Sequence, residues 1–161
     1  MHPSLARGSV TQILTVVLLG CLASAQAVGA ASKDEIEVRQ VILKAMENWS
    51  RLEADANEAY YTTSDKAVFY DFTPMQYVGW ETYKNEIKKV QESIKEFKII
   101  LNDDLTVHVA GKVAWATATW KMDFQFKDGT TRHLEGRLTE VLEKQKGKWK
   151  IIHEHASVPT P

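Results

Sequence analysis

The chain has 161 residues, with 20 lysine and arginine side chains against 21 aspartate and glutamate side chains, and a formal net charge of −1 at pH 7. This balance excludes the strongly basic surface of a nucleic-acid-binding protein, and we expect no nucleic-acid partner. The only cysteine is Cys21, so beyond the N-terminal segment the chain has no thiol for disulfides, nucleophilic catalysis or metal binding.

An export signal is predicted over residues 1–27. Arg7 supplies positive charge, an apolar run follows it, and Ala25 and Ala27 form a small-residue cleavage pattern. The apolar run is shorter than the roughly 20 residues that a transmembrane helix needs. We therefore expect an exported protein, periplasmic or secreted, that leaves the membrane once the signal is removed. A lipid anchor at Cys21 is the alternative.

Residues 33–159 are predicted to form a single domain that begins with helices. Apolar residues at three- and four-residue steps predict a helix over residues 34–52 and another over residues 80–97. A short helix is predicted between them, at residues 55–61. The polar sides of the two longer helices carry interspersed Lys and Glu, as is usual for a solvated face.

The second half of the domain changes to a period of two, which is typical of strands. Together with two short strands between the helices, the predicted strands cover residues 67–72, 76–78, 98–109, 113–127, 130–144 and 149–157. Helices first and strands after indicate an α+β fold. We expect a curved antiparallel sheet wrapped by three N-terminal helices into a cone with one open end.

Two predicted hairpins set the faces of this sheet. A three-residue loop is predicted at residues 145–147, and a two-residue loop at residues 128–129, where Asp-Gly is a strong hairpin signal. Because side chains alternate along a strand, these registers place one set of residues together on the inner face. The set comprises Trp120, Met122, Phe124, Arg137, Thr139, His153 and His155.

We expect this inner face to combine positive charge with an apolar wall. A guanidinium group binds a carboxylate through two hydrogen bonds, so Arg137 beside His155 favours an acidic small molecule. An internal salt bridge of Arg137 with a nearby carboxylate is the alternative. His153 and His155 alone are too few ligands for a metal site, and neither a metal nor a cofactor is expected. The residues expected to contact the ligand are Arg137, Thr139, His155, Trp120, Met122 and Phe124.

The opposite face of the predicted sheet is unusually apolar for a surface in contact with water. Its predicted members are Val113, Trp115, Leu138, Leu142 and Ile152. A contiguous apolar patch of this kind marks an interaction surface, and self-association is the commonest form of it. We expect a homodimer joined through the outer faces of two sheets.

The C-terminal strands resemble those of the nuclear transport factor 2-like superfamily, in its SnoaL-like branch. The residues that carry the resemblance are GRLTEV at 136–141, GKWKI at 147–151 and IHEHAS at 152–157, with Gly79 ahead of a helix. The same ending resembles the association domain of calcium/calmodulin-dependent protein kinase II. The resemblance implies a cone-shaped α+β domain over residues 34–159. It implies no single activity, because this superfamily includes enzymes, binding subunits and assembly domains.

Ketosteroid isomerases of this superfamily use an aspartate base at the end of the first strand, and Asp71 falls near that place. Their oxyanion pair is a tyrosine of the first helix and an acid on a later strand. The chain has Trp49 and Thr139 near those two places, so that reaction is not expected. Asp71 among aromatic residues is still a candidate base, with His153 as its proton-exchange partner. A strand-end aspartate that faces water is the alternative.

Three functions are compatible with these patterns. The first is an exported binding protein for a small apolar, possibly acidic molecule. The second is an acid–base enzyme on a similar molecule, of isomerase, dehydratase or cyclase type, that uses Asp71 and a pocket histidine. The third is an assembly domain like the kinase hub, which fits less well because no further module accompanies the domain.

Overall fold

The computed structural model describes residues 30–72 and 74–160. The predicted export signal, residues 1–27, lies outside the described part. No helix within the described residues is long and apolar enough to cross a membrane.

Three helical segments precede most of the sheet: α1 (Lys33–Ser50), the 3-10 helix η1 (Ala54–Ala59) and α2 (Trp80–Gln91). A capping box begins α1, in which the Ser32 hydroxyl accepts from the Glu35 amide and the Glu35 carboxylate accepts from the Ser32 amide. The prediction for α2 was too long. The helix ends at Gln91 because Ile94, which continues its apolar pattern, is already the buried first residue of a strand.

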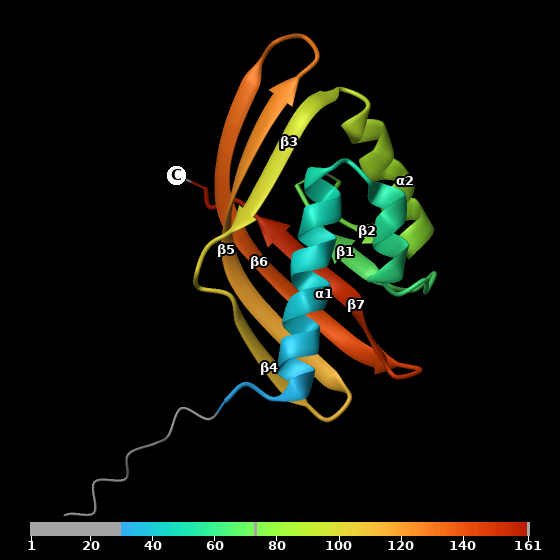
Figure 1. The fold of residues 1–161 in the computed structure, drawn as a ribbon. Helices are drawn as coiled ribbons and strands as arrows, with labels where there is room; N and C mark the ends of the chain where they lie inside the picture. The colour runs from blue at the N-terminus through green and yellow to red at the C-terminus, as the bar shows by residue number, and fades with distance from the viewer. Residues whose placement is uncertain (1–29, 73, 161) are drawn as a thin grey trace, which may run out of the picture. The chain divides into compact units, whose positions relative to one another are not determined.

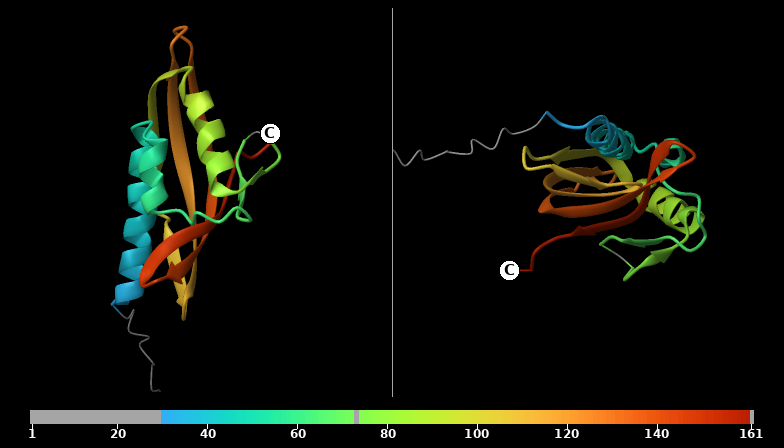
Figure 2. Two further views of the ribbon diagram at one scale, coloured as in Figure 1. Left: turned by 90° about the vertical axis from the view of Figure 1, so that its right-hand side faces the viewer. Right: turned by 90° about the horizontal axis from the view of Figure 1, so that it is seen from below.

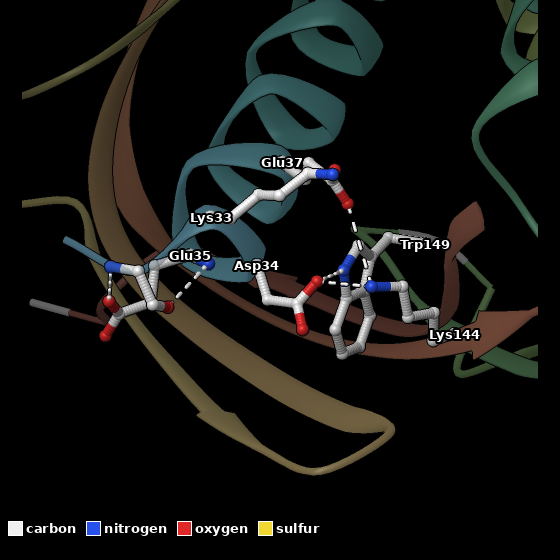
Figure 3. A network of polar contacts seen from close by, with 7 residues as sticks. Lys33, Asp34, Glu35, Glu37, Lys144 and Trp149 are labelled. Atoms are coloured by element: carbon white, nitrogen blue, oxygen red, sulfur yellow. Dashed lines mark hydrogen bonds and ion pairs between the residues drawn. The ribbon is translucent and has the colours of Figure 1, made fainter. Parts of the chain in front are cut away.

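The start of α1 is tied to the strands at the C-terminal end of the chain (Figure 3). Asp34 accepts a hydrogen bond from the indole nitrogen of Trp149 at 3.2 Å and another from the Lys144 ammonium. The same ammonium lies 3.8 Å from a carboxylate oxygen of Glu37. Lys144 and then Trp149 hold the pKa of Asp34 below its usual value. These contacts fix the helix across the sheet.

Seven strands form one curved sheet: β1 (Val68–Tyr70), β2 (Tyr77–Val78), β3 (Ile94–Leu101), β4 (Thr106–Ala110), β5 (Val113–Phe126), β6 (Thr131–Gln145) and β7 (Lys148–Ser157). Their order is β2-β1-β7-β6-β5-β3, with β4 also on β5. The sheet is mixed, since β1 runs parallel to β7. Both α-helices lie on one side of it, as Figures 1 and 2 show. The predicted α+β fold is confirmed.

The two hairpin loops are the reverse of the prediction. The β5–β6 loop has three residues, 127–129, and the Phe126 amide donates to the Thr130 carbonyl at 2.8 Å. The β6–β7 loop has two residues, Lys146 and Gly147, with φ of 49° and 80°. Positive φ at both positions is the mark of a type I′ turn, which matches the twist of the strands even though lysine is strained there. Each predicted register was therefore wrong by one residue.

The shift between β5 and β6 changes which side chains of β6 face the helices. Trp120 pairs with Gly136, where Arg137 was predicted, and Thr119 pairs with Arg137. Arg137 and Thr139 are exposed on the outer face. The residues of β6 that are buried on the inner face are Gly136, Leu138, Glu140 and Leu142. The predicted outer positions of Leu138 and Leu142 were thus wrong, for the same reason.

A bulge in β7 moves the histidines as well. Leu142 pairs with Ile151 but Val141 pairs with His153, so β7 carries one extra residue at this point. An extra residue interrupts the alternation of side chains along a strand. Ile151 is therefore buried on the inner face, and so is Glu154, whereas His155 is exposed.

Candidate functional site

A cavity of about 110 Å³ lies between the two α-helices and the inner face of the sheet. Its aromatic walls are Trp49, Phe72, Tyr83, Phe97, Trp120 and Phe124. Its aliphatic walls are Met46, Leu52, Ile87, Val90, Ile94, Ile99, Met122, Leu138 and Ala156. Its polar lining consists of Asp71, Gln91 and Glu154.

A buried set of acids and phenols adjoins this cavity, and its members Tyr83 and Glu154 line it. The Tyr61 hydroxyl donates to one oxygen of Glu154 at 2.5 Å, and the Tyr83 hydroxyl donates to the other at 2.8 Å. The indole nitrogen of Trp49 donates to the Tyr61 oxygen at 3.0 Å. Glu140 lies opposite Glu154 on the neighbouring strand and is fully buried. Neither oxygen of Glu140 meets a donor among the described residues, so a hydrogen bond between the two carboxyl groups requires a proton on one of them.

Burial is the main cause that raises the pKa values of both glutamates, and the charge of Asp71 adds to the rise at Glu154. Burial is the main cause for Glu140, whose pKa lies well above its usual value, and the charge of Glu154 adds to it. Burial also raises the pKa of Glu154 to about 7, and hydrogen bonds from Tyr61 and Tyr83 limit this rise. The pair therefore holds at least one proton at neutral pH, because two neighbouring carboxyl groups that are both buried cannot both ionise without a large cost in free energy.

Asp71 follows β1 directly and lies on the cavity wall, as a base for a bound molecule must. One of its oxygens accepts from the Phe72 amide at 2.7 Å, and the other lies 3.4 Å from the Tyr83 hydroxyl. Withdrawal from water raises the pKa of Asp71. Asp71, Phe72 and Ala156 also line a hollow on the outer surface. Asp71 thus stands where the cavity approaches the surface.

The predicted site residues are divided between the two faces of the sheet. Trp120, Met122, Phe124 and Asp71 line the cavity. The prediction that the remaining residues share this face was wrong, because the two loops and the bulge in β7 change the alternation. Those residues are His153, His155, Arg137 and Thr139.

The residues on the outer face have partners of their own. The Arg137 guanidinium donates to the Ser157 hydroxyl at 3.3 Å, and Nδ1 of His153 lies 2.7 Å from the Val68 carbonyl oxygen. The rings of both His153 and His155 meet the Tyr70 ring edge-on, at 5.3 and 5.7 Å. His153 is therefore not placed to exchange a proton with a molecule in the cavity.

The sequence interpretation missed the buried acids and phenols that adjoin the cavity. Glu140 could have been found, because it lies two residues from both Leu138 and Leu142 on one strand and must share their face. Glu154 could not, because its inward position depends on the bulge. Tyr83 belongs to the apolar stripe of α2, and the sequence does not indicate its bond to Glu154. Within residues 30–72 and 74–160, no group of three or more His, Cys, Asp and Glu side chains is arranged to hold a metal ion.

The fold is similar to several solved structures. One is a nuclear transport factor 2-like superfamily protein of Salmonella enterica serovar Typhimurium, with 22% identity over 82% of this chain and 95% of that chain and a TM-score of 0.76. A similar protein of unknown function from Pseudomonas putida has 27% identity, coverage of 83% and 92%, and a TM-score of 0.70. A candidate scytalone dehydratase from Novosphingobium aromaticivorans has 10% identity, coverage of 79% and 85%, and a TM-score of 0.70.

Comparison with curated proteins finds no match. The family model of the SnoaL-like domain matches residues 38–161, which include most of α1, all of α2 and the whole sheet. The resemblance carried by the C-terminal strands is thereby confirmed. The chain belongs to the SnoaL-like domain family of the nuclear transport factor 2-like superfamily.

Proposed function

We propose that this protein binds a small, largely apolar molecule in the cavity between its helices and its sheet. The observation that carries the proposal is the cavity itself, about 110 Å³ in volume and lined mainly by aromatic and aliphatic side chains. An apolar protein cavity of about 150 Å³ accepts benzene, so a molecule of about one ring is the expected size. The acidic ligand expected from Arg137 is not supported, because that guanidinium is exposed on the other face of the sheet.

Toluene is a suitable first probe, because it is an apolar molecule of one ring and has no charge. Isothermal titration and the shift in thermal unfolding should both report binding by the unmodified protein. Ala156→Leu adds three carbon atoms to the cavity wall and should abolish binding while the fold survives. Arg137→Met and Thr139→Ala, on the outer face, serve as controls and should bind toluene like the parent. Failure of the parent protein to bind toluene or any other one-ring probe would contradict the proposal.

Acid–base catalysis by Asp71 is the second candidate function. Asp71 is half-buried, lies on the cavity wall and has a raised pKa, as a general base needs near neutral pH. Tyr83 and Glu154, and not His153, lie beside Asp71 as candidate partners for proton exchange. Native mass spectrometry of protein purified from its own host would identify a co-purifying molecule. If the protein converts that molecule, Asp71→Asn should remove turnover and leave binding, and unchanged turnover would exclude this role.

Export and self-association also belong to the proposal. The arrangement of charge, apolar run and small residues in residues 1–27 supports export. Val113 and Trp115 are 42% and 43% exposed on the outer face, where the His108 ring stacks on Trp115 at 5.1 Å. Exposed aromatic and aliphatic side chains on a sheet face support a homodimer through that face.

A further inference from the structure

Within the described part of the chain, the carboxyl groups around the cavity have no basic side chain among them. Asp71 and Glu154 lie on its wall and Glu140 lies behind Glu154, whereas none of the lining residues is a lysine, arginine or histidine. The groups that raise or lower the pKa values of these three acids are other carboxyl groups, the phenols Tyr61 and Tyr83, and the Phe72 amide. Among the described residues, therefore, no cation neutralises the acids from within.

Aromatic side chains line the same space. Phe72 follows Asp71 and meets the Trp120 ring edge-on, with ring centroids 5.7 Å apart. Trp49 and Tyr83 also line the cavity, with ring centroids 5.8 Å apart. The faces of aromatic rings carry negative potential and attract cations, and cages of such rings are used to bind organic ammonium groups. Acids and aromatic rings in one cavity thus favour the same kind of ligand.

The position of Asp71 suits the charged end of such a ligand. A buried ammonium group loses its hydration, and this cost is offset only by a close partner of opposite charge. Asp71 is half-buried and lines both the cavity and the hollow on the outer surface. An ammonium group beside it would keep part of its hydration while the apolar body of the ligand lies among the rings.

We propose that the cavity binds a small organic cation, a protonated amine seated against Asp71 with an apolar body of about one ring. This inference rests on the proposed function, since it names the class of molecule that the cavity takes. The positive charge of this ligand is the opposite of the negative charge that was expected when Arg137 was placed on the inner face.

Binding of a cation should be linked to the release of protons. The groups that face Asp71 are Tyr83 of α2, Tyr77 ahead of α2 and Glu154 of β7, and none of them is a cation. Glu154, with a pKa of about 7, is only partly ionised at neutral pH. A bound cation favours the ionised carboxylates, so amine affinity should fall as pH falls below neutrality.

Three probes of nearly equal size test the ligand class. Benzylamine carries positive charge, benzyl alcohol is neutral and benzoate is negative. By titration calorimetry at neutral pH, benzylamine should bind at least about tenfold more tightly than benzyl alcohol, and benzoate least of all. Repeating the titration in buffers of different ionisation enthalpy should show proton release with benzylamine only. Equal affinity for benzylamine and benzyl alcohol would overturn the inference.

Matched variants locate the charge recognition. Asp71→Asn should bring the affinity for benzylamine down to that for benzyl alcohol, whereas Asp103→Asn, at an exposed acid outside the cavity, should change neither. Phe72→Leu should weaken benzylamine more than benzyl alcohol, and it tests the aromatic contribution if Asp71→Asn does not fold. Toluene separates the two proposals. Binding of toluene without preference for the amine removes only the inference, whereas no binding of any probe removes the proposed function and the inference with it.

Discussion

Glu140 and Glu154 face each other across neighbouring strands in the interior of the protein. They are 0% and 4% exposed, and their pairing in the sheet is direct. Like charges opposite each other on a sheet are destabilising, and a buried carboxylate without a cation is more so. The two residues therefore bind protons more tightly in the folded protein than in the unfolded chain.

This pair predicts that stability falls as pH rises. The pKa of Glu154 is about 7 in the fold against an ordinary value of 4.5, so between these pH values the folded protein binds more protons than the unfolded chain. The stabilisation from the glutamates is complete below the lower value and is lost as pH rises through the upper one. Each proton contributes a slope of at most about 1.4 kcal/mol per pH unit. The free energy of unfolding, measured by urea denaturation at pH 5, 6, 7 and 8, gives this slope.

Glu140→Gln should remove much of this pH dependence, since glutamine is neutral at every pH and its amide can donate to Glu154. We expect the variant to equal or exceed the parent in stability at pH 8 and to differ least at pH 5. Glu135→Gln, at an exposed position of the same strand, provides the control. A parent protein whose free energy of unfolding increases steadily from pH 5 to pH 8 would contradict this account.

Gly136→Ala should destabilise the fold. A β-carbon at this position would lie 2.1 Å from Cζ2 of Trp120 and 2.4 Å from the Ser157 carbonyl oxygen, closer than atoms can approach. Overpacking of this kind costs roughly 1–3 kcal/mol or more. Thermal and urea unfolding measure the loss. In a Trp120→Phe background the cost should be smaller but not zero, because the ring atoms are removed and the carbonyl remains.

The outer face predicts a homodimer that Trp115→Glu should dissociate. Trp115 is 43% exposed in the single chain, and a charge there would be buried without a partner in a sheet-to-sheet interface. Sedimentation velocity of parent and variant measures the change. Leu142 does not serve this purpose, because it is fully buried on the inner face and Leu142→Glu should unfold the chain. A parent protein that sediments as a monomer at micromolar concentration would refute the dimer.

Export predicts the N-terminus of the mature protein. Cleavage after Ala27 or Ala25 leaves Val28 or Gln26 as the first residue. Intact mass spectrometry of the protein from the periplasm or culture medium of its host should show one of these two masses. A chain that begins at Cys21 and carries acyl groups would support the lipid anchor.

The sequence was sufficient for the elements whose pattern is local. The periodic apolar residues of α1 and the long alternation of β5 and β6 predicted both the fold class and the inner positions of Trp120, Met122 and Phe124. The site was predicted less well, because it depends on how strands pair. Each loop differed from its prediction by one residue, and a shift of one residue turns every side chain of the partner strand to the other face.

Trp149 and Ile151 are buried on the inner face, where burial of an apolar side chain such as Ile151 contributes roughly 1.5–3 kcal/mol. Regular alternation along the strand from these two residues would place His153 and His155 on the inner face as well. The extra residue in β7 separates the two halves of the strand, and nothing in the local sequence indicates where such a residue is accommodated.

The bulge in β7 has one more consequence. Had the strand continued from Ile151 in regular alternation, His153 and His155 would lie inside and Glu154 would lie in water. The interior would then carry two imidazoles beside Asp71 and Glu140, whose positions do not depend on β7. One extra residue in the strand therefore decides whether β7 turns a carboxyl group or two imidazoles toward the interior, without any change of side chain.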